Sequence, residues 1–236
     1  QTAVLRVLNN HEEIRLEELS MNQKQTDSFL NWTRTRSGMI VLSGPTGSGK
    51  TTTLHAILKR IALENKLHVV SLEDPIEIFD DNYLQLQINE AGGFTYEEGI
   101  KELLRHDPDV IMIGEIRDPV TARMLLRCAL SGHLIFTTIH AKCCTEAIKR
   151  LNEFGLHNEE LYHTLSAVCA QRLYKKNGTD ERVCIYEILE QRELDAYFHE
   201  GQVPKEHHDI FEEIQAAVSK GIISQKEAVI DLPYAQ

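Results

Sequence analysis

Short apolar runs alternate with amphipathic stretches along the first two thirds of the chain. These runs are apolar throughout rather than at every second position, which is typical of strands buried on both faces of a parallel sheet. The predicted strands cover residues 39–43, 68–72, 84–88, 109–113 and 134–138, and the predicted helices cover residues 50–64, 96–105 and 119–131. This alternation predicts an α/β domain with a mostly parallel sheet and helices on both faces.

The start of the chain predicts two further elements. Residues 3–8 form an apolar run of strand length, and a polar connector follows. Residues 17–35 predict a turn and then an amphipathic helix, with Met21, Phe29 and Trp32 on one side. The first strand has no visible hairpin partner, so it is interpreted as the end of a longer preceding segment.

After residue 145 the pattern becomes mainly helical. The predicted helices cover residues 145–154, 158–173, 206–220 and 224–230, and one strand at residues 182–189 interrupts them. The stretch from residue 191 onward is acidic and predicts a solvated face. The predicted division is a remnant of an N-terminal domain with its linker at 1–16, a core at 17–190, and a helical extension at 191–236.

Composition and charge narrow the class of protein. The 236 residues are 42% hydrophobic and 26% charged, which is ordinary for one globular unit. No apolar run approaches the about 18 residues that a membrane-spanning helix needs. These features predict a cytoplasmic protein with only peripheral membrane association. The formal net charge of −11 argues against direct nucleic-acid binding.

The five cysteines predict reduced thiols rather than a metal site. They lie at positions 128, 143, 144, 169 and 184, and none forms a C-x-x-C pair. Cys143 and Cys144 lie close to His140 in the sequence, but a fourth ligand at suitable spacing is missing. The sequence therefore predicts no structural zinc.

A glycine-rich segment at residues 44–51 fits the pattern G-x-x-x-x-G-K-[ST] without a mismatch. Glycines let the backbone curl so that several N–H groups face one phosphate, and the following helix adds its positive end. Lys50 is predicted to reach the β- and γ-phosphates, and the Thr51 hydroxyl to bind Mg²⁺. The predicted nucleotide contacts in this segment are Gly44, Pro45, Thr46, Gly47, Ser48, Gly49, Lys50, Thr51 and Thr52.

Acidic residues follow two of the predicted strands. Glu115 ends the apolar run that begins at residue 110, so the sheet delivers it to the edge where the glycine-rich loop lies. A carboxylate there can bind Mg²⁺ and orient the attacking water. Glu73 and Glu77 flank Pro75 after another apolar strand. One of these two is predicted to position water or metal near the γ-phosphate, and the alternative is a polar loop with capping acids.

Two histidines bracket the predicted strand at 134–138. His133 and His140 are seven residues apart, and an odd separation places them on opposite faces of a regular strand. Histidine suits contact with phosphate because its charge changes near neutral pH. From spacing alone, one core histidine and one loop histidine is the favoured interpretation.

Taken together, these motifs resemble the ATPases of type II secretion and type IV pili. The glycine-rich loop, the segment at 73–77, the segment at 114–118 and the histidine-flanked strand stand in the order of that family's Walker A, Asp box, Walker B and His box. Residues 105–109 and the Gln171–Leu173 stretch also resemble family segments. The resemblance covers about residues 17–190 and implies a RecA-like P-loop NTPase fold.

The resemblance implies roles for particular residues. Glu115 matches the Walker B glutamate needed for hydrolysis and, with Thr51, the Mg²⁺ site. Glu77 matches the Asp-box glutamate near the attacking water, with Glu73 beside it. His133 and His140 match the His-box pair. Arg6 lies on a strand similar to one that supplies arginines to the nucleotide, and an exposed strand residue is the alternative.

The resemblance also implies partners and a place in the cell. It implies ATP and Mg²⁺ as cofactors, a homo-hexamer, and an inner-membrane platform protein as the partner on the cytoplasmic face of the membrane. The tetracysteine zinc module of many extension and secretion ATPases is absent, so the chain is most similar to the competence-pilus assembly ATPases of Gram-positive bacteria. The alternatives are a pilus-retraction ATPase, a RecA-like nucleic-acid motor of helicase or conjugation type, and a nucleotide-gated scaffold.

Overall fold

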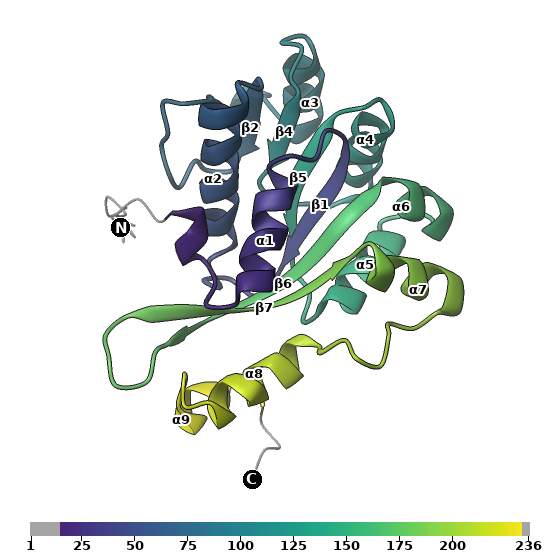
Figure 1. Ribbon diagram of the computed structural model, residues 1–236. Coiled ribbons are helices and arrows are strands. Elements are labelled where there is room, and N and C mark those ends of the chain that lie inside the picture. The colour runs from purple at the N-terminus through teal and green to yellow at the C-terminus, as the bar shows by residue number, and fades with distance from the viewer. Residues whose placement is uncertain (1–14, 233–236) are drawn as a thin grey trace.

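The computed structural model describes residues 15–232, and Figure 1 shows their arrangement. The strand predicted at residues 3–8, with Arg6, lies outside the described residues. The strands are β1 (Gly38–Ser43), β2 (Val69–Glu73), β3 (Leu84–Gln87), β4 (Val110–Ile113), β5 (Leu134–Ile139), β6 (Leu165–Lys175) and β7 (Arg182–Glu190). Within the described residues they form one sheet in the order β3-β2-β4-β5-β1-β6-β7. Neighbouring strands are parallel except β6 and β7, which form an antiparallel hairpin.

Helices connect these strands and extend beyond the last one. They are α1 (Gln23–Trp32), α2 (Lys50–Arg60), α3 (Tyr96–Leu104), α4 (Pro119–Leu130), α5 (Cys144–Glu153), α6 (Asn158–Thr164), α7 (Arg192–Glu200), α8 (Ile210–Ser219) and α9 (Gln225–Ala228). Short 3-10 turns cover Leu16–Glu18 and Glu90–Gly92, and a π-helical turn, Ile61–Asn65, continues α2. The helix predicted at 50–64 is therefore α2 together with this turn.

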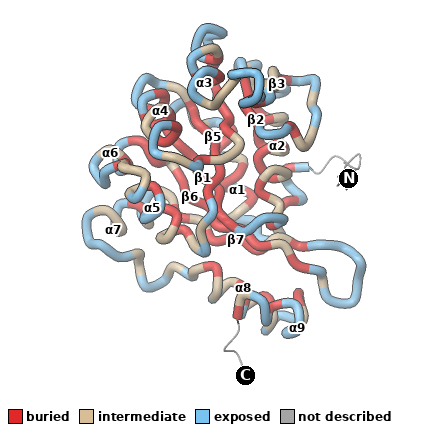
Figure 2. Tube along the Cα trace, turned by 180° about the vertical axis from the view of Figure 1, so that it is seen from behind, coloured by how far each residue is buried: buried red, intermediate tan, exposed pale blue. Residues whose placement is uncertain are grey.

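The sheet is covered on both faces, as the sequence predicted. Alternate residues of β1 enter different cores, because successive side chains of a strand point to opposite faces. Met39 and Val41 pack in one hydrophobic cluster, while Ile40 and Leu42 pack in the other. Helices α1 and α2 contribute to the second cluster, whereas α3, α4, α5 and α6 contribute to the first. In Figure 2 the buried residues accordingly concentrate along the central strands.

Two sequence predictions about the elements were wrong. The helix predicted at residues 158–173 is α6 followed by strand β6, so two strands rather than one lie in this part of the chain. Met21 does not share the buried side of α1 with Phe29 and Trp32, because its exposed fraction is 63% against 0% and 3%. Helix α7 was not predicted as a separate element. The boundary at residue 190 between a core and a helical extension stays a prediction.

The topology brings several loops to one edge of the sheet. The carboxyl ends of β1, β2, β4 and β5 lie at this edge because these strands are parallel neighbours. The segments that follow these strands carry the sequence motifs. In residues 15–232, the helices are all too short or too polar to cross a membrane.

Candidate functional site

The loop between β1 and α2 requires glycine at several positions. Gly44, Gly47 and Gly49 have φ values of 147°, 78° and 88°, where residues with a Cβ are strained. A Cβ on Gly44 would also lie 2.5 Å from the Gln171 carbonyl oxygen, and one on Gly49 would lie 2.8 Å from Gln171 Nε2. The loop is thus packed tightly against β6, and larger residues cannot replace these two glycines without displacing it.

The amino end of α2 is suited to bind an anion. Its N-cap residue, Gly49, provides no side-chain cap, and the first N–H groups of a helix lack partners within the helix. Ser48 Oγ is buried without a hydrogen-bond partner at the same place. A phosphate would satisfy these donors and would interact favourably with the helix dipole. The residues present therefore fit the triphosphate group that the sequence predicts.

Lys50 lies inside the loop and is 9% exposed. Its Nζ donates hydrogen bonds to the carbonyl oxygens of Gly44 and Pro45, both at 2.9 Å. Burial lowers the pKa of Lys50, while the nearby Glu115 and Glu77 carboxylates act in the opposite direction. The predicted Asp-box glutamate, Glu77, thus lies close enough to Lys50 to influence its charge.

Glu115 is held between two basic side chains at the end of β4. Its side chain is 22% exposed, and Oε2 accepts a hydrogen bond from Arg117 Nε at 3.1 Å. Arg117 also donates to Asp74 Oδ2 at 3.1 Å. On its other side, Glu115 Oε1 lies 3.3 Å from His140 Nε2. Residues that follow β2, β4 and β5 are therefore joined through one carboxylate.

His140 connects this carboxylate to the glycine-rich loop. Its Nδ1 lies 3.2 Å from the Gly44 carbonyl oxygen, while its Nε2 faces Glu115. Both neighbours are acceptors, and a neutral imidazole donates through one nitrogen only, so both contacts are satisfied together when the ring carries two protons. The contacts of His140 place it between the loop and the predicted catalytic acid.

Glu73 is buried beneath the loops at this edge, and its role near the nucleotide stays a prediction. It is 3% exposed and points toward α2, where Oε2 lies 3.4 Å from His55 Nε2. Its Oε1 accepts hydrogen bonds from Ser71 Oγ at 2.7 Å and from Gln85 Nε2 at 3.1 Å. His55 in turn contacts the Tyr83 hydroxyl. These contacts of Glu73 join β2, β3 and α2.

His133 lies at the opposite end of β5 from His140. Its Nδ1 is 3.0 Å from the Cys128 carbonyl oxygen and 3.0 Å from Ser131 Oγ. The two histidines therefore lie at opposite edges of the sheet, separated by the length of β5. The structure does not bring His133 to the glycine-rich loop of its own chain, and its role at the nucleotide stays a prediction.

Gln171 was predicted only as part of a family stretch, without a role. It is fully buried, and its Nε2 donates to the Ser48 carbonyl oxygen at 2.7 Å. Its Oε1 accepts a hydrogen bond from Thr53 Oγ1 at 3.1 Å. The side chain therefore holds both the loop and the first turn of α2. The order Gln171-Arg172-Leu173 was the available signal, but the strand that carries it was predicted as a helix.

The structure places some of the remaining predicted contacts at the site and does not describe one of them. Thr51 and Thr52 lie in the first turn of α2, beside the predicted phosphate position. The Thr51 hydroxyl and the Glu115 carboxylate are oxygen donors of the kind that Mg²⁺ prefers. Arg6 lies outside the described residues. Arg117, two residues after Glu115, was not singled out, although a basic residue so close to a predicted catalytic acid was a usable signal.

Comparison with known proteins gives consistent results. A family described as Type II/IV secretion system protein matches residues 1–229. The chain is similar to the competence protein ComGA of Bacillus subtilis (strain 168), with 35% identity over 94% of this chain and 67% of that protein. It is also similar to the type II secretion system ATPase E of Vibrio cholerae, with 35% identity over 82% of this chain and 39% of that protein.

A solved structure extends the likeness to three dimensions. The crystal structure of the pilus retraction motor PilT with bound ADP superposes with a TM-score of 0.79. It is 27% identical, over 98% of this chain and 70% of that one. The chain spans about two thirds or less of the length of the curated relatives it matches.

Proposed function

The chain belongs to the type II/IV secretion system protein family, and on that premise we propose that it is an ATP-hydrolysing motor. We propose further that the motor powers assembly of a pilus or pseudopilus for competence DNA uptake or type II secretion. The observation that carries the proposal is the polar chain from Glu115 through His140 to Gly44, next to Lys50. It joins a carboxylate to a loop that fits a phosphate.

The proposed chemistry assigns one task to each group. Lys50 would exchange the carbonyl oxygens of its own loop for β- and γ-phosphate oxygens. Glu115 would orient the attacking water and accept its proton, and it would release Arg117 or His140 to do so. His140 lies where it can respond to the γ-phosphate, because it already contacts both the loop and Glu115. Glu77 would assist in placing the water.

Magnesium completes the proposed site. We assign the Thr51 hydroxyl and the Glu115 carboxylate to hold Mg²⁺ directly or through water. The bound ion would neutralise phosphate charge as the γ-phosphate leaves. The ADP in the similar PilT structure supports a nucleotide as the ligand of this fold.

The proposed working form is a homo-hexamer on the cytoplasmic face of the membrane. Its partner would be the platform protein of a pilus or secretion machine in the inner membrane. The names of the relatives support this setting, since they include a competence protein and a secretion ATPase. A further relative, named type IV pilus assembly ATPase TfpB of Acinetobacter baylyi, is 38% identical over 72% of this chain and supports assembly.

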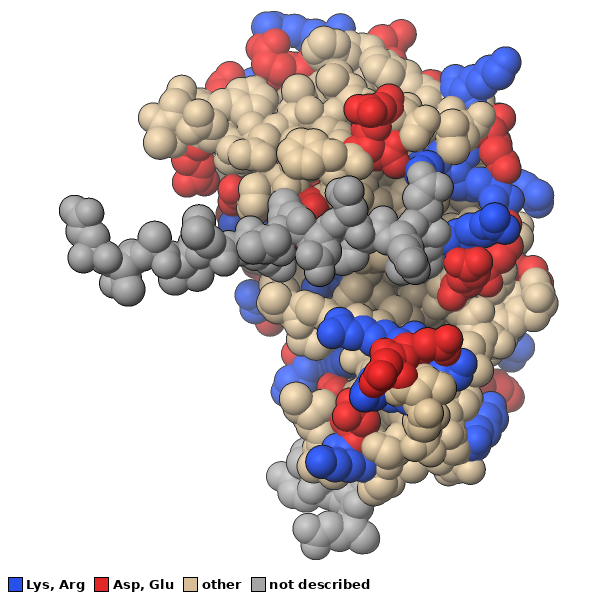
Figure 3. Space-filling view, turned by 90° about the vertical axis from the view of Figure 1, so that its left-hand side faces the viewer, with Lys and Arg blue, Asp and Glu red and all other residues tan. Residues whose placement is uncertain are grey.

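A nucleic-acid motor is the second candidate for the same phosphate chemistry. The net charge of −11 disfavours it. On the face shown in Figure 3, basic and acidic side chains are interspersed, and no continuous basic stripe is seen among the residues drawn in colour. ATP hydrolysis that increases several-fold on addition of single- or double-stranded DNA would favour this candidate over a pilus motor.

The Glu115→Gln variant tests the proposed chemistry. We expect it to bind ATP as the unaltered chain does and to lose about 10²–10⁴-fold in turnover, because the amide cannot accept the proton of the attacking water. Phosphate release and nucleotide binding would be measured side by side. Glu102→Gln is the matched control, since the Glu102 side chain on α3 is 44% exposed and pairs with its helical neighbour Arg105. Turnover that is equal in the two variants would refute the role of Glu115.

A further inference from the structure

Arg172 is a buried cation that lies beside the glycine-rich loop. Its side chain is 5% exposed, and it uses three nitrogen atoms as donors. Nη1 donates to the Gln171 carbonyl oxygen at 3.0 Å, and Nη2 donates to the Lys142 carbonyl oxygen at 2.7 Å. Nε donates to Asp231 Oδ1 at 2.7 Å. The guanidinium group therefore joins β6, the segment after β5, and the segment that follows α9.

Two of these contacts reach the backbone of the candidate site. The Gln171 carbonyl oxygen is the atom nearest to the position that a Cβ on Gly44 would take, at 2.5 Å. Lys142 lies two residues after His140, which contacts both Gly44 and Glu115. Arg172 thus fixes the backbone on both sides of the point where His140 meets the loop. A shift of Arg172 would therefore move the backbone at Gln171 and at Lys142, which supports the loop and His140.

Asp231 supplies the charge that makes this arrangement favourable. A buried guanidinium needs a partner, and removal of that partner leaves an uncompensated charge in a poorly hydrated place. Asp231 comes from far along the chain, and its second oxygen accepts a hydrogen bond from the Tyr174 hydroxyl at 2.6 Å. Burial and then the bond to Asp231 raise the pKa of Tyr174, so this hydroxyl remains a donor. The carboxylate is therefore held at both of its oxygens.

The same groups line one cleft. It has a volume of about 670 Å³, and its walls include Gly44, His140, Arg172 and Asp231, together with Phe211 of α8 and Ile230. The segment that follows α9 thus reaches the cleft next to the glycine-rich loop. The Asp231 carboxylate contacts Arg172, which holds the Gln171 backbone beside the loop, rather than the loop itself.

We propose that Asp231 is a positioning residue of the nucleotide site, which acts by holding Arg172 against the backbone at Gln171 and Lys142. The proposal rests on the proposed function, because it presumes that the loop binds a nucleotide. The proposal assigns a role at the nucleotide site to Asp231, which lies in the segment that follows α9. Through this residue, the placement of α8 and α9 and the shape of the nucleotide site depend on each other.

Nucleotide affinity tests the proposal, with Asp231→Asn compared against Asp180→Asn. The control pair, Lys175 and Asp180, belongs to the same hairpin and has the same 2.7 Å separation, but its side chains are 55% and 101% exposed. We expect the Kd for Mg-ADP to rise about tenfold in Asp231→Asn, as for loss of one charged hydrogen bond. It should change by less than about twofold in Asp180→Asn, because exposed ion pairs contribute little.

The measurement is titration calorimetry at a temperature at which circular dichroism shows every variant to be folded. Asp231→Glu keeps the charge and should recover part of the affinity, which a purely structural role in the last helices would not require. If Asp231→Asn does not fold, Tyr174→Phe replaces it, because this variant keeps the ion pair and frees only one carboxylate oxygen. We expect it to weaken binding about threefold, less than Asp231→Asn does, because Arg172 keeps its charged partner.

The outcomes separate this inference from the proposed function. If the unaltered chain binds no nucleotide, the proposed function fails, and the inference fails with it. If the unaltered chain binds Mg-ADP and Asp231→Asn has the affinity of Asp180→Asn, only the inference is overturned, whatever the melting temperature. Unchanged affinity in Tyr174→Phe, measured where Asp231→Asn does not fold, overturns it equally.

Discussion

The parallel part of the sheet and its antiparallel edge contribute to the candidate site in different ways. The segments after β2, β4 and β5 supply polar side chains, of which His140 contacts both the loop and Glu115. The β6–β7 hairpin supplies Gln171 and Arg172, which hold the backbone of the loop and of the segment after His140. The groups proposed to act on the nucleotide and the groups that hold the backbone around them thus come from different regions of one sheet.

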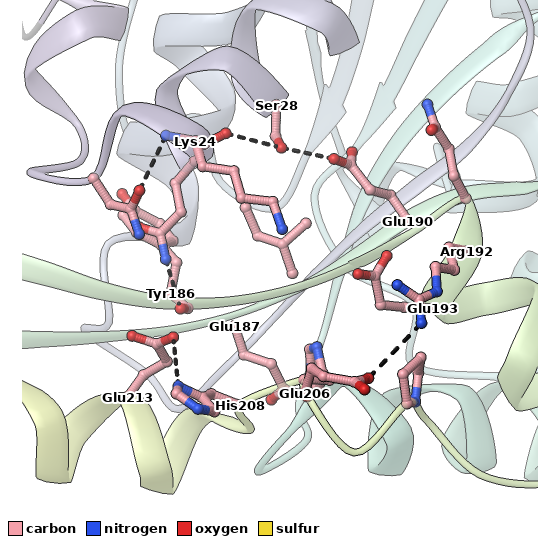
Figure 4. Close-up of a pocket in the computed structure, with 16 residues that line it drawn as sticks. Lys24, Ser28, Tyr186, Glu187, Glu190, Arg192, Glu193, Glu206, His208 and Glu213 are labelled. Atoms are coloured by element: carbon pink, nitrogen blue, oxygen red, sulfur yellow. Dashed lines mark hydrogen bonds and ion pairs between the residues drawn. The ribbon is translucent and has the colours of Figure 1, made fainter.

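The hairpin can support the loop because it is anchored elsewhere. Figure 4 shows Glu190 of β7 directed toward Ser28 of α1, which donates to it at 2.7 Å. The other oxygen of Glu190 accepts from Trp32 Nε1 at 3.1 Å. Buried Glu187 accepts from the backbone N–H groups of Cys144 and Ile210, the first residues of α5 and α8. One face of the hairpin thereby fixes α1, and the other fixes two helix ends.

The largest effect should follow a change in the parallel region. Lys50→Ala removes the side-chain cation of the loop that is predicted to reach the β- and γ-phosphates, and we expect turnover to fall by at least about 10²-fold, as when one preorganised donor is lost. ATP affinity should fall with it, whereas Glu115→Gln should retain binding. Phosphate release and calorimetric titration distinguish the two. Lys101→Ala, on exposed α3, is the control, and equal turnover in Lys50→Ala and Lys101→Ala would contradict the assignment of the loop.

The sequence predicted the parallel region well because its signals are local. An apolar run has the length of a strand, and the glycine-rich loop has fixed spacing, so neither requires knowledge of the fold. The spacing did not give the direction of the Glu73 side chain relative to that of Glu77. Val69 packs toward α2, so the alternation along β2 also directs Glu73 toward α2. That direction follows only once the position of α2 is known.

The hairpin region was predicted poorly for a physical reason. Strand β6 is buried almost throughout, so it lacks the alternation that marks a half-exposed strand. It contains Ala167, Ala170, Gln171 and Leu173, which are good helix formers, and no glycine or proline separates it from α6. Tertiary burial beside β1 overrides these local preferences. The interaction between Arg172 and Asp231 spans 59 residues, and no sequence pattern predicts such a contact.

An intermediate effect should follow a change in the hairpin's support of the loop. Gln171→Ala removes the hydrogen bonds to the Ser48 carbonyl oxygen and to Thr53 Oγ1. Two neutral hydrogen bonds correspond to about tenfold in affinity if the loop loses its shape. We expect the Kd for Mg-ADP to rise by that factor while Glu115 still supports hydrolysis at saturating ATP.

Gln171→Glu sharpens this test, because it keeps the size of the side chain but cannot donate to the Ser48 carbonyl oxygen. Weaker binding in both variants would support a role in shaping the loop. If both variants bind Mg-ADP as tightly as the unaltered chain, the hairpin does not support the loop, and the comparison between the two regions fails.

The smallest effect on activity should come from the attachment of the hairpin to α1. Glu190→Ala leaves Trp32 Nε1 without its acceptor and leaves Ser28 Oγ with the Lys24 carbonyl oxygen, and we expect the free energy of unfolding to fall by about 1–3 kcal/mol. Turnover and Mg-ADP affinity should change by less than about twofold, because Glu190 lies at the end of β7 and none of its hydrogen bonds reaches the loop. Urea denaturation measures the free energy of unfolding, and steady-state phosphate release measures turnover.

Glu181→Ala, which removes an exposed ion pair of the same hairpin, should leave stability and turnover unchanged. A loss of Mg-ADP affinity in Glu190→Ala as large as that in Gln171→Ala would mean that the hairpin transmits strain along its whole length to the loop. Support of the site would then be a property of the hairpin as a rigid unit rather than of Gln171 and Arg172.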